Sequence, residues 1–150
     1  DGRVFIADAA NLSAAAESQA QAKPGSLATW LDASGARWLL TPSASGIMAW
    51  KVADRGGKPA LQQGWASREL RNPLAPVVIN GIVFTGSAGM KGTPAVVYAL
   101  DAATGKELWN SGKTAVSFAS NPRALSAGGG QVYLTTNDGT LHAFGFPMEH

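Results

Sequence analysis

Short apolar runs separated by turn residues dominate the pattern of the chain. Val, Ile, Leu, Phe and Trp gather in runs of about four to eight residues, and Gly, Asn, Asp and Pro separate these runs. This pattern is typical of β-strands joined by tight turns. It predicts strands at 4–8, 27–32, 36–41, 47–52, 61–67, 76–80, 82–87, 96–101, 107–111, 123–126, 131–136 and 140–146. The chain is therefore expected to be all-β.

Three turns between these runs have a defined chemistry. Asn80-Gly81 has the composition of a two-residue hairpin turn with positive φ angles, and Asn137-Asp138-Gly139 is expected to act similarly. The segment 101–105 predicts a longer turn, because the Asp101 carboxylate can accept a hydrogen bond from the backbone two residues on. Gly105 is expected to take the left-handed conformation that closes this turn.

A near-repeat runs along the chain. Val97–Ala103 echoes Val4–Ala10, since both are apolar strands that lead into Asp-Ala-Ala. Two weaker echoes, at 46–51 and 139–144, are strands centred on alanine. The equivalent positions 6, 49, 99 and 143 give spacings of 43, 50 and 44 residues. A period of about 40–50 residues with four strands per unit is typical of β-propeller blades.

This period divides residues 1–150 into one partial propeller. We expect a blade tail at 1–8 with a surface excursion at 9–26 that includes a helical turn before Pro24, a blade at about 27–67, a second at about 75–112, and a last partial blade at about 122–146. The fold class is therefore predicted as four-stranded antiparallel blades, about three of them. Because a propeller needs roughly 4–8 blades, the chain is interpreted as part of a larger ring and as a fragment.

Two features predict that the blades stack face to face. The run 96–100 is apolar at every position, which indicates a strand covered on both faces. Trp50, Trp65 and Trp109 recur near equivalent strand ends, so we expect them to pack between blades with each indole N–H donating to a backbone carbonyl.

Composition and charge narrow the classes of function. The 150 residues are 45% hydrophobic and carry a net charge of +2 from basic residues that are scattered singly, so we predict no nucleic-acid partner. The absence of cysteine excludes disulfides, thiolate metal sites and a cysteine nucleophile. Since the apolar runs fall short of about 18–20 residues, no membrane-spanning segment is expected.

No candidate catalytic residue emerges. The carboxylates lie mostly in turns or near the ends of the chain, and we read Asp101 and Asp138 as turn residues, with a calcium pair at Asn137 and Asp138 as the alternative. The two histidines cannot build a multi-histidine metal site; we expect His142 to be packed or hydrogen-bonded and His150 to be solvated. The pair Trp50-Lys51 could stack on a planar ligand or simply pack. The glycine-rich segment 86–92 lacks phosphate-loop spacing and is read as a loop.

The pattern Ala99-x-Asp101-x-x-Thr104-Gly105-Lys106-x-x-Trp109 resembles the tryptophan-docking motif of PQQ-like repeat (quinoprotein-type) propellers. The resemblance implies that Trp109 packs between neighbouring blades over the glycine turn, with Asp101 and Thr104 fixing that turn. On this basis Trp109→Ala is expected to cost about 3–5 kcal/mol of stability.

The resemblance also implies a function. A non-catalytic binding or scaffold module of the bacterial cell envelope, in the periplasm, is the favoured interpretation. Its partners would be the remaining blades and envelope proteins, and no cofactor is predicted within this chain. The alternative is the C-terminal part of a pyrroloquinoline quinone-dependent alcohol or sugar dehydrogenase, in which the quinone and calcium would bind on blades outside these residues.

Overall fold

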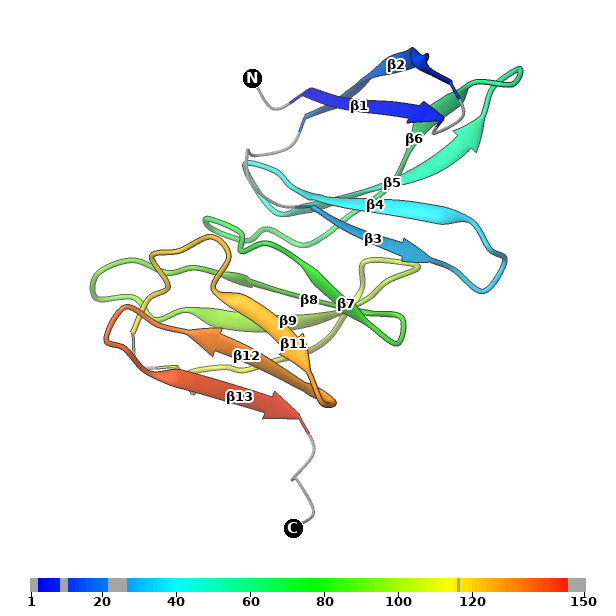
Figure 1. The fold of residues 1–150 in the computed structure, drawn as a ribbon. Helices are drawn as coiled ribbons and strands as arrows, with labels where there is room; N and C mark the ends of the chain where they lie inside the picture. The colour runs from blue at the N-terminus through cyan, green and yellow to red at the C-terminus, as the bar shows by residue number, and fades with distance from the viewer. Residues whose placement is uncertain (1–2, 9–10, 22–26, 116, 146–150) are drawn as a thin grey trace.

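The computed structural model describes residues 3–8, 11–21, 27–115 and 117–145. Within these ranges the chain is all-β and contains no helix, and therefore no helix with the length and apolarity to cross a membrane. The strands, shown in Figure 1, are β1 (Arg3–Asp8), β2 (Asn11–Gln21), β3 (Ala28–Leu31), β4 (Arg37–Pro42), β5 (Ile47–Asp54), β6 (Pro59–Ala66), β7 (Val77–Ile79), β8 (Ile82–Ser87), β9 (Val96–Asp101), β10 (Glu107–Asn110), β11 (Leu125–Gly128), β12 (Gln131–Thr135) and β13 (Leu141–Gly145).

The strands form antiparallel sheets in which sequence neighbours pair. The first sheet has the order β3-β4-β5-β6, the second β7-β8-β9-β10 and the third β11-β12-β13. Strands β1 and β2 form a separate N-terminal hairpin. None of these sheets closes on itself. The connections within the three sheets are hairpins of two to five residues, except the longer loop 88–95 between β8 and β9.

Each of the twelve predicted strands is confirmed, with ends that agree to within two residues where the structure describes them. One strand was not predicted. The segment 9–26 was expected to be a surface excursion, but residues 11–21 of it form β2. Strand β1 has hydrogen-bonding groups along its edge, and β2 satisfies them by antiparallel pairing with two register shifts. The sequence does not predict this strand, because its side chains are small or polar and show no apolar alternation. The helical turn expected before Pro24 is wrong for the residues up to Gln21, which belong to β2, and residues 9, 10 and 22–26 of the excursion lie outside the described ranges.

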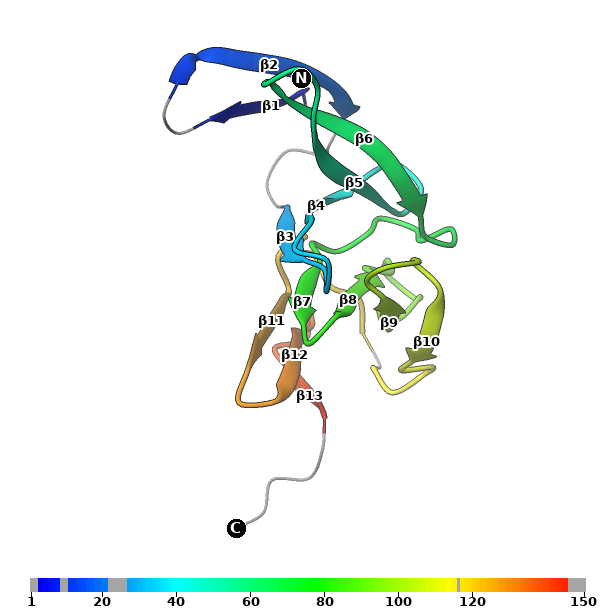
Figure 2. The ribbon, with the colours of Figure 1, turned by 90° about the vertical axis from the view of Figure 1, so that its right-hand side faces the viewer.

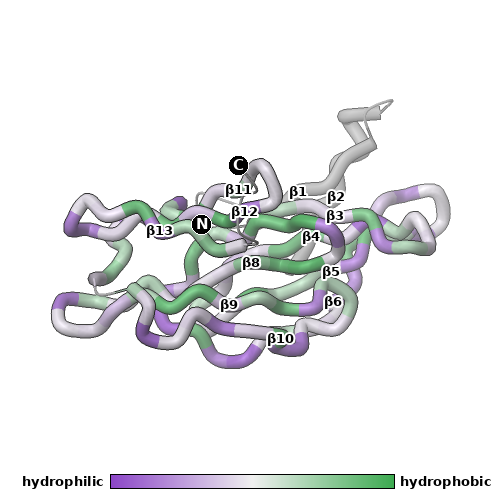
Figure 3. The backbone as a smooth tube through the Cα atoms, turned by 90° about the horizontal axis from the view of Figure 1, so that it is seen from below, coloured by the Kyte–Doolittle hydropathy of each residue, from purple (hydrophilic) through white to green (hydrophobic). Residues whose placement is uncertain are grey.

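Two apolar clusters hold the sheets together. The first interface, between the first and second sheets, buries a cluster of residues from both sheets and from the connection between them: Leu40, Ile47, Ala49, Leu70, Val83, Leu100 and Ala102. The second interface, between the second and third sheets, buries another: Leu74, Ala88, Ala95, Val97, Ala115, Ala119, Ala124, Leu125, Val132 and Leu134. In Figure 3 the backbone of β8 and β9 is coloured mainly as hydrophobic.

Strand β9 contributes to both interfaces. Leu100 belongs to the first cluster, with Tyr98 packed against it, whereas Val97 belongs to the second. The prediction that both faces of 96–100 are covered is therefore confirmed. The first strands of the three sheets also lie next to one another, because β7 contacts both β3 and β11. Figure 2 shows these short strands gathered along one side of the stack, with β10 on the far side of the second sheet.

Candidate functional site: a tryptophan docked between two sheets

The turn from β9 to β10 is fixed by one carboxylate. Asp101 Oδ1 accepts hydrogen bonds from the backbone N–H of Ala103 at 3.0 Å and of Thr104 at 2.8 Å, and from the Thr104 hydroxyl at 2.8 Å. The Gly105 N–H donates to the Asp101 carbonyl at 2.8 Å, and Gly105 has φ +73°. Both predicted roles within this turn are confirmed.

Electrostatics follows from this geometry. The hydrogen bond from the Thr104 hydroxyl, together with those from the two N–H groups, lowers the pKa of Asp101 below its ordinary value. The carboxylate is ionised at neutral pH and acts only as an acceptor. Asp101 is thus part of the turn, and its Oδ1 accepts from two backbone N–H groups and one hydroxyl of that turn.

The residue that docks on this turn is Trp65, which lies on β6 of the first sheet. Its indole N–H donates to the Ala102 carbonyl at 3.0 Å, across the first interface. A Cβ at Gly105 would lie 2.7 Å from Trp65 Cδ2 and would overlap the neighbouring ring carbon Cε3. Only glycine leaves room for the ring here, and only glycine adopts this φ without strain. The indole is therefore seated on the turn of the adjacent sheet.

Trp109 occupies a different environment from the one expected. It lies on β10 and is 44% exposed, so it is not buried between two sheets. Its ring meets that of Phe144 on β13 edge-on, at a centroid distance of 5.8 Å and an interplanar angle of 60°. Among the described residues, the third sheet has no turn from a third to a fourth strand on which Trp109 could dock. The residue that packs on the Gly105 turn is thus Trp65, whereas Trp109 lies at the second interface, beside Phe144.

The other members of the motif play structural parts. Ala99 is buried, 5% exposed, and lies opposite Trp109 and Phe84 in the sheet, where a small side chain lets the layers approach. Lys106 is exposed, and its carbonyl accepts the Asp101 N–H at 2.9 Å.

An ion pair lies on the same side of the first interface. Arg68, just after β6, contacts Glu107 at the start of β10 with an N–O distance of 2.5 Å. Its guanidinium also lies 5.2 Å from the centre of the Tyr98 ring. Arg68 lowers the pKa of Glu107, with help from a hydrogen bond from Asn110. Because the Arg68 side chain is 53% exposed, solvent screens the pair, and its contribution to stability is small.

Sequence reasoning missed a second turn of the same kind. Asp32 Oδ1 accepts from the N–H groups of Ser34 and Ala36 and from the Ser34 hydroxyl, while Oδ2 accepts the Trp38 indole N–H at 2.9 Å. The Ser34 hydroxyl and the Trp38 indole together lower the pKa of Asp32 far below its usual range. The segment Asp-Ala-Ser-Gly at 32–35 is the signal that could have found it, since it mimics Asp101–Gly105 one residue shorter.

Trp50 and Lys51 do not form a joint ligand site. The Trp50 indole N–H donates to the Thr41 hydroxyl at 3.1 Å, a side-chain acceptor where a backbone carbonyl was expected. Lys51 Nζ lies 5.9 Å from the centre of the Trp38 ring. Consecutive strand residues point to opposite faces, so the two cannot hold one planar group between them.

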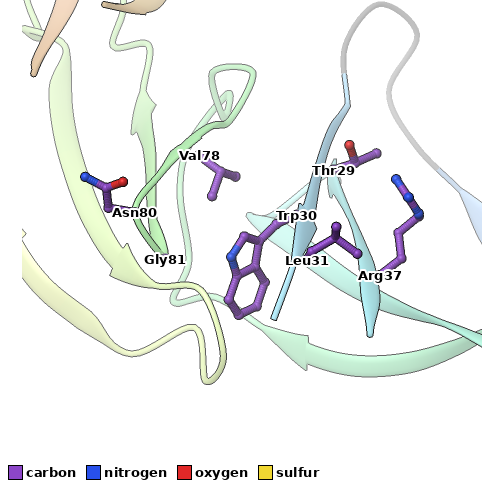
Figure 4. Close-up of a pocket in the computed structure, with 7 residues that line it drawn as sticks. All are labelled: Thr29, Trp30, Leu31, Arg37, Val78, Asn80 and Gly81. Atoms are coloured by element: carbon purple, nitrogen blue, oxygen red, sulfur yellow. The ribbon is translucent and has the colours of Figure 1, made fainter. Parts of the chain in front are cut away.

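A hollow of about 350 Å³ lies between the end of β3 and the β7–β8 turn (Figure 4). Its lining mixes apolar, amide and cationic side chains: Thr29, Trp30, Leu31, Arg37, Val78, Asn80 and Gly81. In Figure 4 the Trp30 ring points into the gap toward Gly81, whereas Arg37 points away on the other side of β3. The polar groups do not converge on a single point, so the hollow is not arranged as a catalytic site.

A second hollow, of about 370 Å³, lies at the opposite end of the second sheet, beside the β8–β9 loop. It takes in the glycine-rich segment, where Met90 and Thr93 form a tight bridged hairpin and Gly89 has φ +74°. Residues 88–92 of this segment form a loop, as predicted, whereas Gly86 and Ser87 end strand β8. Arg68, which lines this hollow, is already paired with Glu107.

The turn at 137–139 and His142 form a small polar network. Asp138 Oδ1 accepts the Thr136 hydroxyl at 2.7 Å, and this contact lowers the pKa of Asp138. His142 Nε2 lies 3.3 Å from Thr136 Oγ1, and its ring stacks on Phe144 at 6.4 Å. His142 is therefore packed and hydrogen-bonded, as predicted, and His150 lies outside the described residues. Asn137 Oδ1 accepts the Ser120 hydroxyl at 2.9 Å.

The carboxylates and histidines of the described residues lie apart from one another. No group of three or more histidine or carboxylate side chains comes together within them. In Asp32, Asp101 and Asp138, one carboxylate oxygen accepts a hydrogen bond from a backbone N–H of the same turn. Neither the scan of protein-family models nor the search of curated proteins finds a match for this chain.

Proposed function

We propose that the three sheets are blades of a PQQ-like repeat β-propeller, and that the chain serves as a non-catalytic binding or scaffold module in the bacterial cell envelope. The single observation that carries the proposal is the seat of Trp65 on the Gly105 turn of the adjacent sheet. A tryptophan that joins one four-stranded unit to the next is the arrangement that the docking motif implies. The sheets with consecutive strand order and the row of first strands agree with blades around an axis.

The hydrogen-bonded turn carboxylates and the packed sheets favour a binding function over a catalytic one. Hydrogen bonds lower the pKa of the turn carboxylates Asp32, Asp101 and Asp138, so none of these three is poised as a general base near neutral pH. A stack of sheets that is fixed by docked aromatic rings provides a stable surface on which loops and edges can meet a partner. The remaining blades of the ring and envelope proteins are the partners that the proposal names.

A calorimetric titration of the full-length protein with pyrroloquinoline quinone in the presence of calcium tests this function. The expected result is no heat of binding from a sample whose near-ultraviolet circular dichroism shows packed tryptophans. Tight one-to-one binding would overturn the proposal and assign the protein to the quinone-dependent dehydrogenases.

A further inference from the structure

The second hollow, beside the β8–β9 loop, contains two charged groups that the fold does not use. Its walls come from the connection between β6 and β7 and from the loop between β8 and β9. Glu69 and Arg71 both line it, and both side chains are exposed. Among the described residues, neither side chain has an ion pair or a hydrogen bond. One carboxylate and one guanidinium therefore line the same hollow without a partner in the described chain.

The backbone that carries these two side chains is fixed to both sheets. Leu70, which lies between them in the sequence, is fully buried, and its N–H donates to the Ser45 carbonyl of the first sheet at 2.8 Å. The Asn72 carbonyl accepts the N–H of Ala88, just after β8, at 3.1 Å, and Asn72 has φ +48°. A residue other than glycine is uncommon in this left-handed region and is kept there by its surroundings. The charged side chains on either side of Leu70 thus project from a held segment.

The remaining charged side chain of the hollow is already neutralised. Arg68 pairs with Glu107 at 2.5 Å, and its guanidinium lies 5.2 Å from the centre of the Tyr98 ring. Arg68 therefore supplies no net charge to a ligand. What the lining presents is one positive and one negative group, two residues apart in the sequence.

The opposite wall of the hollow is largely apolar. Met90, which is 52% exposed, lies in the β8–β9 loop, where its N–H and carbonyl exchange hydrogen bonds with Thr93 at 2.9 and 2.8 Å. Further apolar surface comes from Pro94, Val96 and Tyr98. Sites for small molecules combine such apolar surface with a few polar groups that fix the orientation of the ligand. The volume of about 370 Å³ also falls in the range of such sites, roughly 300–1,000 Å³.

We propose that the second hollow binds a free α-amino acid with an apolar side chain. The planar guanidinium of Arg71 would pair with the carboxylate of the ligand through two N–H groups. The carboxylate of Glu69 would accept hydrogen bonds from the ammonium group. The apolar side chain of the ligand would lie against Met90 and Val96 and lose contact with water there. A binding site for a small molecule goes beyond the proposed scaffold function.

The unpaired charges favour a zwitterion over an ion of a single sign. A simple anion would pair with Arg71 but would be repelled by Glu69, and a simple cation would meet the reverse arrangement. An α-amino acid carries both charges one carbon apart, so it satisfies both side chains at once. Its affinity therefore depends on both of its charged groups, which gives the proposal a sharp test.

The probe is L-leucine, titrated into the protein and followed by calorimetry and by the amide resonances of residues 87–98. Two analogues each lack one charge: 4-methylpentanoate has no ammonium group, and 3-methylbutylamine has no carboxylate. We expect leucine to bind at one site, and each analogue to bind at least about tenfold more weakly, because it leaves one charged group of the hollow unpaired. These controls act on the ligand and are independent of how any variant folds.

Variants of the chain assign each charge to its partner. Arg71→Gln should weaken leucine binding at least about tenfold but leave binding of 3-methylbutylamine within about twofold, since that analogue has no carboxylate to lose. Glu69→Gln should act in the same way on leucine and spare 4-methylpentanoate. Arg55→Gln removes an exposed arginine of the β5–β6 hairpin, outside the hollow, and should leave leucine binding within about twofold.

The outcomes separate this proposal from the scaffold function. The proposal is overturned if leucine does not bind, if either analogue binds as tightly as leucine, or if Arg71→Gln and Glu69→Gln change no more than Arg55→Gln does. Tighter binding of 4-methylpentanoate than of leucine would also overturn it and would identify a site for simple anions. Quinone binding in the titration above would remove the scaffold function and leave the expected leucine result unchanged.

Discussion

At the scale of single residues, the contact between Trp65 and Gly105 decides how two sheets meet. The indole is held by a hydrogen bond to the Ala102 carbonyl and by the flat surface that a residue without a Cβ provides. Each requirement is specific: a donor in the ring, an acceptor in the turn and a positive φ at the glycine. The geometry of the contact therefore explains why tryptophan and glycine occupy these two positions.

The glycine can be tested with a matched pair of substitutions. Gly105→Ala should cost about 2–4 kcal/mol of unfolding free energy, because it adds both left-handed strain and overlap with the Trp65 ring. Gly35→Ala has a similar φ of +79° but nothing within 4 Å of the added Cβ, so it should cost only about 1–2 kcal/mol. Urea unfolding of both variants measures the difference. Equal losses would show that the ring does not press on the turn.

At the scale of elements, the turns depend on ionised carboxylates. Asp32, Asp101 and Asp138 each hold a turn together, and donors from the same turn lower the pKa of each. A carboxyl group whose pKa is lower in the folded state stabilises the fold above its unfolded pKa, near 4. That stabilisation is lost as the pH falls through the lowered pKa, when the folded state must also take up the proton.

Asp101→Asn tests this linkage. The amide keeps one acceptor oxygen but cannot be ionised, so the variant should be less stable than the parent at pH 7. The difference in unfolding free energy should shrink as the pH falls below about 4, the unfolded pKa of an aspartate. Urea titrations at pH 7 and at pH 2.5 measure it. A difference that is the same at both pH values would mean that the charge of Asp101 does not stabilise the turn.

Most elements could be predicted from the sequence because their signals are local. Apolar runs bounded by Asn80-Gly81 or by the 101–105 turn define strands and their ends without knowledge of the fold. Strand β2 could not be found, since it forms by pairing with β1 and its own residues show no apolar alternation. Pairing between distant segments is a property of the fold and leaves little trace in composition.

The sequence also did not predict which tryptophan packs on the Gly105 turn. The motif shows that a tryptophan lies ten residues after Ala99, but it does not show on which turn that tryptophan rests. The structure separates the two halves of the motif: the turn 101–105 receives Trp65 from the preceding sheet, and Trp109 points to the following one. A contact between sheets can be assigned only once their order in space is known.

At the scale of the whole molecule, the sheets form a stack in which the first packs against the second and the second against the third. The first interface and the second have separate apolar clusters, joined through β9. In such a stack stability is close to a sum of unit and interface contributions. Loosening one interface should therefore leave the other largely intact.

Native-state hydrogen exchange tests this independence. In Trp65→Phe, which loses the hydrogen bond to Ala102 but keeps a ring, amides of β4 and β5 should exchange faster, whereas those of β12 should keep their protection. Uniform acceleration across both sheets would indicate one cooperative unit and would contradict the description of separable interfaces.

The measurement that tests the docking contact most directly is the unfolding free energy of Trp65→Ala beside that of Trp109→Ala, in urea at pH 7. Trp65 is seated on a turn and hydrogen-bonded, so its removal should cost about 3–5 kcal/mol. Trp109 is 44% exposed, so its removal should cost less than about 2 kcal/mol. A loss below about 1 kcal/mol for Trp65→Ala, or an equal or larger loss for Trp109→Ala, would contradict the assignment of Trp65 as the residue that joins the sheets.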